Sequence, residues 1–281
     1  MYLIRNTGYV HAISNDAGRS MMGSRQENWF YNQLIESAQR KATWRVIGSQ
    51  TGEKFKDKLK ASRTNINPVF SRINESLAYG NVDPLDYDAW DGYQSNRNRT
   101  FNTLYSHNIG NNIVISGDSH ANWVSDLVWL DNQPYDPATG KGAIGVEFAG
   151  SAVSSPSPAG QNISIAAANN ASAWLIGANR ELQWSELYYR GYFELHIGHD
   201  SVNASYFGLP TIINRNPNEI SLANFTVLSG ANALYRGPAG VSGGGVVENG
   251  ALKGGRTVQT NETNSTATGL YFISHEDVED I

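Results

Sequence analysis

The first strong pattern along the chain is a helical spacing of apolar residues. Between residues 24 and 38 the apolar side chains recur every three or four positions, so they fall on one face of a helix. Ser24, with Glu27 three residues later, has the spacing of a capping box, which predicts that the helix begins there. Residues 43–48 then have the composition of a strand.

A second helix and a second strand follow. Residues 95–107 return to helical spacing, and the β-branched run within residues 112–117 predicts a buried strand. Together with the strand at 43–48, the order is strand, helix, strand. Such a unit places its two strands parallel in one sheet, so both strands end at the same edge.

The chain continues this mixed pattern up to residue 210. Further strands are predicted at residues 123–130 and 143–148, and a helix at residues 180–190. Residues 191–197 and 201–207 alternate between apolar and polar positions and predict an antiparallel hairpin. The succession of helices and strands indicates an α/β fold.

Two stretches interrupt the pattern. Residues 51–67 are polar and strongly basic, which is typical of a solvated surface insert. From residue 211 to residue 281 the chain is rich in asparagine and glycine, which predicts a partly flexible tail. We therefore divide the chain into a domain at 1–210, interrupted by the insert, and a tail at 211–281.

Composition narrows the class of protein. The 281 residues are 40% hydrophobic and 11% aromatic, which is enough for a substantial core. A formal net charge of −5 gives no general case for binding nucleic acid or an anionic membrane. No apolar run approaches the length of a membrane-spanning helix. The absence of cysteine excludes disulfides and a thiol nucleophile.

The candidate chemistry lies at the end of the strand at 112–117. Gly117 permits a sharp turn, and Asp118 and His120 follow it two positions apart. A carboxylate and an imidazole at the carboxyl end of a parallel strand suit a metal ion, which would hold a water or a phosphate oxygen. An ordinary turn is the alternative interpretation. Gln50, which follows the strand at 43–48, would lie at the same edge of the sheet.

Several short motifs occur in a fixed order over residues 15–210. They are GRSMMG at 18–23, Gln26 and Trp29, WRVIGSQ at 44–50, WDGY at 90–93 with Arg97 and Arg99, GDSH at 117–120 with Trp123 and Asp126-Leu127, EFAGS at 147–151 with SSP at 154–156, and GYF at 191–193. Each motif is weak alone, but together their order and spacing resemble the PhoD-like alkaline phosphatase family, fungal branch.

This resemblance implies a fold, an activity and a set of site residues. The fold is a metallophosphoesterase-type α/β sandwich, with metals at the carboxyl ends of the strands. The activity is hydrolysis of phosphate monoesters and diesters, using iron together with calcium. Asp118 and His120 are then metal ligands, and Gln50, Trp90 and Trp123 line the substrate pocket. In such chemistry the cation neutralises phosphate oxygens and lowers the pKa of a bound water.

The chain also departs from the family pattern. A Gly-Asp-Pro turn and a Trp-Asp-Asp-His-Glu stretch, which supply most of the other ligands in the family, are absent. We therefore interpret the chain as the carboxyl-terminal part of the domain, incomplete at its amino-terminal side and impaired in activity. In the family pattern the segment ending at Gln50 runs almost directly into residues 69–71, so residues 51–67 are interpreted as an insertion.

Sequons for asparagine glycosylation indicate the secretory pathway. They begin at Asn74, Asn98, Asn162, Asn170, Asn203, Asn224, Asn261 and Asn264. A polar, asparagine-rich surface would generate such sequons as well. We expect a monomeric extracellular or secretory-pathway protein whose signal lies outside this chain. The competing hypothesis is a catalytically inactive secreted glycoprotein that retains only the scaffold.

Overall fold

The computed structural model describes most of the chain. The described residues are 13–49, 90–117, 119–130, 132–157, 160, 163–213, 218–236, 246–248, 251–253, 261–264 and 271–274. Several residues singled out from the sequence lie outside them. These are Gln50, Asp118, the basic stretch at 51–67, and the sequon residues Asn74 and Asn162.

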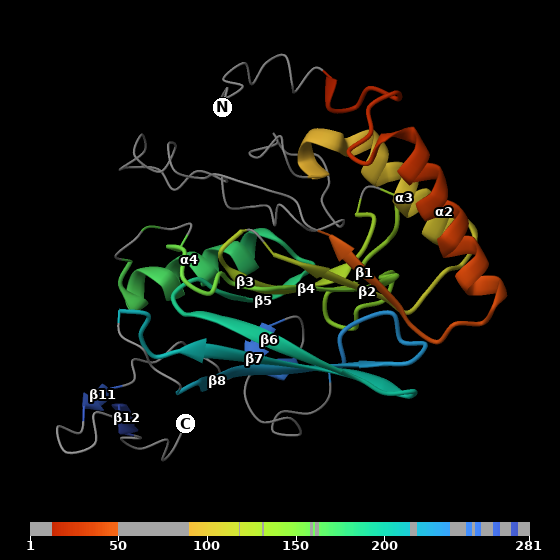
Figure 1. The fold of residues 1–281 in the computed structure, drawn as a ribbon. Coiled ribbons are helices and arrows are strands. Elements are labelled where there is room, and N and C mark those ends of the chain that lie inside the picture. Colours follow the sequence, from red (N-terminus) through yellow and green to blue (C-terminus); the bar gives the residue numbers. More distant parts are fainter. Residues whose placement is uncertain are drawn as a thin grey trace.

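A five-stranded mixed sheet forms the centre of the molecule (Figure 1), and its strands are ordered β1-β2-β4-β3-β5. The strands are β1 (Arg45–Ser49), β2 (Asn112–Ser116), β3 (Asn122–Leu127), β4 (Gly145–Ala149) and β5 (Leu182–Glu186). β1, β2 and β4 are parallel, whereas β3 is antiparallel to both β4 and β5. The predicted parallel pairing of β1 with β2 is confirmed. Ser49 is in register with Ser116, so both strands end at one edge.

Helices cover one face of this sheet (Figure 1). They are α2 (Gly23–Gln39), the short 3-10 helix η2 (Trp90–Tyr93), α3 (Gln94–Ser106) and α4 (Ile165–Ala178). Leu34 of α2 and Phe101 of α3 pack with Val114 of β2. Leu175 of α4 packs with Leu182 of β5. The apolar face predicted for residues 24–38 is therefore the face that α2 buries.

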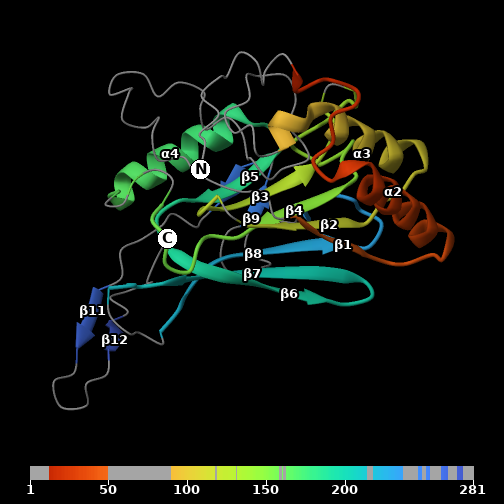
Figure 2. The ribbon, with the colours of Figure 1, turned by 45° about the horizontal axis from the view of Figure 1, so that its top comes forward.

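A second, antiparallel sheet covers the opposite face (Figure 2). It consists of β6 (Arg190–Ile197), β7 (Ser201–Leu209) and β8 (Ile220–Leu228), in that order. Trp184 and Phe148 from the first sheet pack against Tyr206 and Phe225 from the second. Burying each of the two phenylalanine side chains contributes roughly 1.5–3 kcal/mol. The predicted α/β class and the hairpin of residues 191–197 and 201–207 are confirmed.

The helix predicted at residues 180–190 is wrong. This stretch forms β5 and the first residue of β6. A register shift opposite Val124 and Ser125 interrupts the pairing of β5 with β3. Because of that bulge, Leu182 faces the α4 side while Trp184 faces the second sheet. The apolar positions therefore lose the simple alternation of a strand, and their remaining spacing resembles that of a helix.

The helix starts also differ from prediction. The Ser24–Glu27 capping box does not form, because α2 begins at Gly23 and its N-cap is Met22 without a side-chain cap. Glu27 instead accepts hydrogen bonds from Arg99. The sequence pattern did not predict α4. Its start carries a side-chain cap, with the Ser164 hydroxyl accepting the N–H of Ala167 at 3.2 Å.

Part of the chain after residue 210 packs into the domain. β8 pairs with β7 and contributes Ala223 and Val227 to the core between the sheets. Further along, Arg236 forms a buried ion pair with Asp126 of β3 at 2.5 Å. The antiparallel pairs β9 (Val246–Glu248) with β10 (Ala251–Lys253) and β11 (Asn261–Asn264) with β12 (Tyr271–Ser274) follow. The domain division at residue 210 stays a prediction, and β8 extends the packed structure beyond it.

Candidate active site

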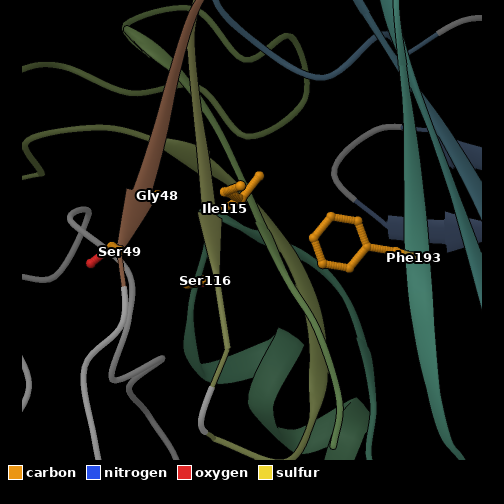
Figure 3. A pocket seen from close by; sticks show the side chains of 5 residues that line it. All are labelled: Gly48, Ser49, Ile115, Ser116 and Phe193. Carbon is orange, nitrogen blue, oxygen red and sulfur yellow. The ribbon is translucent and has the colours of Figure 1, made fainter. Parts of the chain in front are cut away.

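An open pocket of about 330 Å³ lies at the carboxyl ends of β1 and β2. It is lined by Gly48, Ser49, Ile115, Ser116 and Phe193 (Figure 3). Phe193 belongs to β6, so both sheets contribute to this pocket. The Ser116 hydroxyl donates a hydrogen bond to the carboxylate of Glu147 at 2.8 Å.

Both tryptophans predicted to line the site are buried. Trp90 is 5% exposed and packs among the residues of α2 and α3, and its indole N–H donates to the Ser49 hydroxyl at 3.3 Å. Trp123 is 4% exposed and packs against α4. Its indole N–H is buried without a hydrogen-bond partner within the described part of the chain. Trp90 thus reaches the pocket edge through Ser49, and the pocket role of both residues stays a prediction.

His120 lies in the turn between β2 and β3. It is half-buried, and its backbone has a φ of +61°, in the left-handed region. Its ring nitrogen Nδ1 is 3.1 Å from the carbonyl oxygen of Pro156. A carbonyl oxygen can only accept a hydrogen bond, so this contact assigns the proton to Nδ1. In the neutral imidazole the Nε2 atom then keeps its lone pair, as it does in histidines that bind metals.

A buried arginine holds the backbone of this turn. The Nη1 atom of Arg190 donates to the carbonyl oxygens of His120 at 2.8 Å and of Ser155 at 3.0 Å. Its Nη2 atom donates to the carbonyl oxygens of Leu187 at 3.2 Å and Tyr188 at 3.4 Å. Burial lowers the pKa of Arg190, and the charge of Glu186 acts in the opposite direction.

Glu186 organises the neighbouring backbone. Its carboxylate accepts the N–H groups of Tyr188 at 2.6 Å and Tyr189 at 2.9 Å, and the side-chain amide of Asn122 at 3.3 Å. The other end of that amide accepts the N–H of Ser151 at 2.7 Å. Burial raises the pKa of Glu186, and the backbone N–H donors partly offset that rise.

Neither Glu186 nor Arg190 was predicted from the sequence to belong to the site. The only available signal was a pair of opposite charges, four residues apart, within an otherwise apolar and aromatic stretch. Charged residues in such surroundings are seldom fully buried unless they are paired. That observation indicates a buried polar network, but it does not reveal that the network ends at His120.

The residues described by the structure do not by themselves make a metal site. No three histidine, aspartate or glutamate side chains among them come together to hold an ion. His120 has the right donor atom and outer contact, but iron and calcium both need several ligands. A single imidazole does not complete a site for either metal, and Asp118 lies outside the described residues. We derive no chemical step through a metal.

Other motif residues join helices rather than the site. The Nε atom of Arg19 donates to the carbonyl oxygen of Gly92 at 2.8 Å, and its guanidinium lies 4.2 Å from the ring centroid of Tyr93. The side chain of Asn96 accepts the N–H of Met21 at 3.0 Å. The GRSMMG and WDGY motifs therefore pack against each other beside the start of α2.

The sequon residues differ in accessibility. Asn170 on α4 and Asn203 on β7 are exposed, whereas Asn98 and Asn224 are half-buried. Asn261 and Asn264 lie in β11. Glycosylation stays a prediction at all of them. None of the helices in the described ranges is long and apolar enough to cross a membrane.

Comparison with known proteins gives concordant matches. The family model of PhoD-like phosphatases matches residues 4–206. Alkaline phosphatase D of Bacillus subtilis (strain 168) is 30% identical over 142 residues, which cover 50% of this chain and 20% of that protein. A solved structure of PhoD superposes with a TM-score of 0.57 at 22% identity, covering 85% of this chain and 39% of that chain. The chain thus spans less than half the length of either relative.

Proposed function

The chain belongs to the PhoD-like phosphatase family, and we propose that it forms part of the active site of a phosphoesterase that hydrolyses phosphate monoesters and diesters. The observation that carries this proposal is the geometry of His120. Its strained turn follows β2, and Pro156 holds its Nδ1 proton, which leaves Nε2 to bind a ligand.

We propose Asp118 and His120 as two of the metal ligands, and iron together with calcium as the metals. Family membership implies metal-dependent chemistry in general. When bound, such cations neutralise phosphate oxygens and activate a water. Among the described residues, the contact of the His120 Nδ1 atom with the Pro156 carbonyl oxygen supports the role of His120 as a metal ligand. A complete metal site requires further ligands besides His120.

The pocket beside this turn suits the organic part of a phosphoester. Ile115 and Phe193 give it an apolar wall (Figure 3), and its volume of about 330 Å³ lies within the range of small-molecule sites. Gln50, Trp90 and Trp123 are proposed to complete the pocket. Trp90 is connected to its lining through Ser49.

The wider interpretation follows the family. We propose a metallophosphoesterase-type sandwich in which residues 1–210 form the carboxyl-terminal part of the domain. We also propose a monomeric, glycosylated protein of the secretory pathway, and the exposure of the sequon residues Asn170 and Asn203 supports the glycosylation. With one candidate ligand among the described residues, we expect slow turnover from this chain alone.

A specific observation also favours a second candidate function. Among the described residues, no group of three or more carboxylates and imidazoles comes together to hold a metal ion. A secreted glycoprotein that keeps the scaffold without the chemistry would show the same arrangement. The two candidates differ in one measurable property, which is metal-dependent hydrolysis.

The test is hydrolysis of p-nitrophenyl phosphate and bis(p-nitrophenyl) phosphate after chelation and after iron and calcium are restored. We expect slow hydrolysis that chelation abolishes and the two metals restore. Asp118→Asn should lower the rate of hydrolysis by at least about 100-fold. This loss exceeds the roughly 10–100-fold that is typical when a residue bonded to a metal ligand is changed. The matched control Asp200→Asn changes an exposed carboxylate in the β6–β7 turn and should have no effect. No hydrolysis with metals restored would support the inactive scaffold.

A further inference from the structure

The conformation of His120 requires an explanation outside its own sequence. Among the described residues, the non-glycine positions with positive φ are Lys41, Asn108, Asn111, His120 and Asn232. Asparagine and histidine occur in this region more often than most other residues, but a residue with a side chain still costs free energy there. Strained backbone of this kind persists only where the surrounding structure fixes it.

The guanidinium group of Arg190 holds both the backbone of His120 and the loop that contacts its imidazole ring. Arg190 donates from Nη1 to the carbonyl oxygen of His120 itself, at 2.8 Å. From the same nitrogen it donates to the carbonyl oxygen of Ser155, at 3.0 Å. Ser155 directly precedes Pro156, whose carbonyl oxygen faces Nδ1 of the imidazole. Arg190 thus links the backbone of the histidine to the loop that orients its ring.

The guanidinium is itself fixed. Arg190 is 5% exposed, and its Nη2 atom donates to the carbonyl oxygens of Leu187 and Tyr188. The Glu186 carboxylate accepts the N–H groups of Tyr188 and Tyr189, which holds that turn in place. The Ser151 hydroxyl, 3.0 Å from the carbonyl oxygen of Tyr189, lies 3.4 Å from that of His120.

We propose that Arg190 is a positioning residue for His120, with Glu186 as its support. By clamping the His120 and Ser155 carbonyls, Arg190 keeps Pro156 within reach of Nδ1. It thereby selects the tautomer in which Nε2 presents a lone pair to the reaction centre. This inference rests on the proposed function for its catalytic meaning, but the tautomer itself can be measured without any turnover.

The test is a ¹⁵N–¹H spectrum of the histidine side chains, recorded on protein labelled with ¹⁵N-histidine. The pH is fixed at about 8.5, well above the ordinary imidazole pKa of about 6.5. The His120 signals are assigned by their loss in His120→Ala. We expect Nδ1 to carry the proton in the unmodified protein. In Arg190→Gln the signals should move toward the other tautomer or an average of both. An unchanged Nδ1-protonated form in a folded Arg190→Gln protein would overturn the proposal.

A matched control separates positioning from general stability. Arg236 is also a buried arginine, and it donates to the carbonyl oxygens of Pro137 and Leu234 and to Asp126. Arg236→Gln should lower the urea midpoint and leave the His120 tautomer unchanged. If Arg236→Gln shifts the tautomer as much as Arg190→Gln, the effect is global and the proposal is wrong.

If Arg190→Gln does not fold, the proposal can be tested with the milder variant Glu186→Gln. Glu186→Gln retains the shape of the side chain, but it weakens the support of the Tyr188–Tyr189 turn and of Asn122. It should shift the same tautomer signals part of the way, and an unshifted spectrum would contradict the proposal.

The proposed phosphoesterase activity and the positioning role of Arg190 can be refuted separately. If the phosphoesterase proposal holds, Arg190→Gln should lower kcat by about 10–100-fold, in the range of outer-shell partners. KM for p-nitrophenyl phosphate should change much less. Absence of hydrolysis in every variant would refute the proposed function while the tautomer spectra still decide the role of Arg190.

Discussion

At the scale of single residues, the site depends on backbone positions that tolerate little change. The left-handed conformation of His120 costs about 1–3 kcal/mol, which the surrounding hydrogen bonds must offset. Arg190 supplies two of those bonds from the first position of β6. Gly191 follows it, and its N–H donates to the carbonyl oxygen of Ala152 at 3.2 Å. This backbone hydrogen bond joins the start of β6 to the loop after β4.

A methyl group at Gly191 is predicted to destabilise the protein. A Cβ there would lie 1.9 Å from the backbone carbonyl oxygen of Phe207, so β6 and β7 would have to separate. We expect Gly191→Ala to lower the free energy of unfolding by about 3 kcal/mol, measured by urea denaturation. Gly198→Ala, where the nearest atom is 3.4 Å away, serves as the control. Equal losses in the two variants would contradict the steric explanation.

At the scale of elements, α2 and α3 are joined by a partly buried ion pair. The Nε atom of Arg99 donates to the Glu27 carboxylate at 2.5 Å, and Arg99 also donates to the carbonyl oxygens of Ala17 and Arg19. Burial alone would raise the pKa of Glu27. Hydrogen bonds from Arg99, Ser20 and Tyr31 outweigh that effect and hold its pKa below the usual 4.5.

This pKa gives a pH-dependent prediction. Because the pKa of Glu27 is lower in the folded state, its contribution is present above about pH 4.5 and is lost as the pH falls through the lowered value. Arg99→Gln should therefore cost about 1–2 kcal/mol near pH 7, and the cost should shrink toward pH 3, followed by urea midpoints. Arg40→Gln is the control, since its pair with Glu36 is exposed and 3.8 Å long. A cost that is independent of pH would contradict this assignment.

The sequence predicted those elements in which the apolar residues follow the regular spacing of a single helix or strand face. Examples are the apolar face of α2, the β1-α3-β2 unit and the β6–β7 hairpin. Each of them has one buried side or a fully apolar run of residues. β5 was missed because a bulge shifts Leu182 and Trp184 to opposite faces. α4 was missed although Ser164 and an alanine-rich run mark it.

The candidate site was predictable only in part. Asp118 and His120 stood out because a carboxylate and an imidazole follow a buried strand. The support of His120 could not be read from the sequence, because Arg190 acts through backbone carbonyl oxygens. Every residue has a backbone carbonyl oxygen, so the residues that Arg190 contacts cannot be recognised by their side chains. Their proximity is a property of the folded chain.

At the scale of the whole molecule, the site joins parts of the chain that are distant in sequence. His120 lies between two strands of the first sheet, Ser155 follows β4, and Arg190 begins the second sheet. The two sheets share one apolar core, and the indole N–H of Trp44 donates across them to the carbonyl oxygen of Gly198 at 2.8 Å. The geometry around His120 therefore exists only when both sheets are packed together.

We propose that this turn is the reaction centre of a phosphoesterase. The most direct test compares kcat/KM for p-nitrophenyl phosphate, with iron and calcium supplied, in the unmodified chain, His120→Ala and His196→Ala. His196 is an exposed histidine on β6 and controls for the loss of an imidazole. We expect His120→Ala to lose at least about 100-fold, beyond outer-shell effects, and His196→Ala to match the unmodified chain. Turnover that is unchanged in His120→Ala would contradict the account.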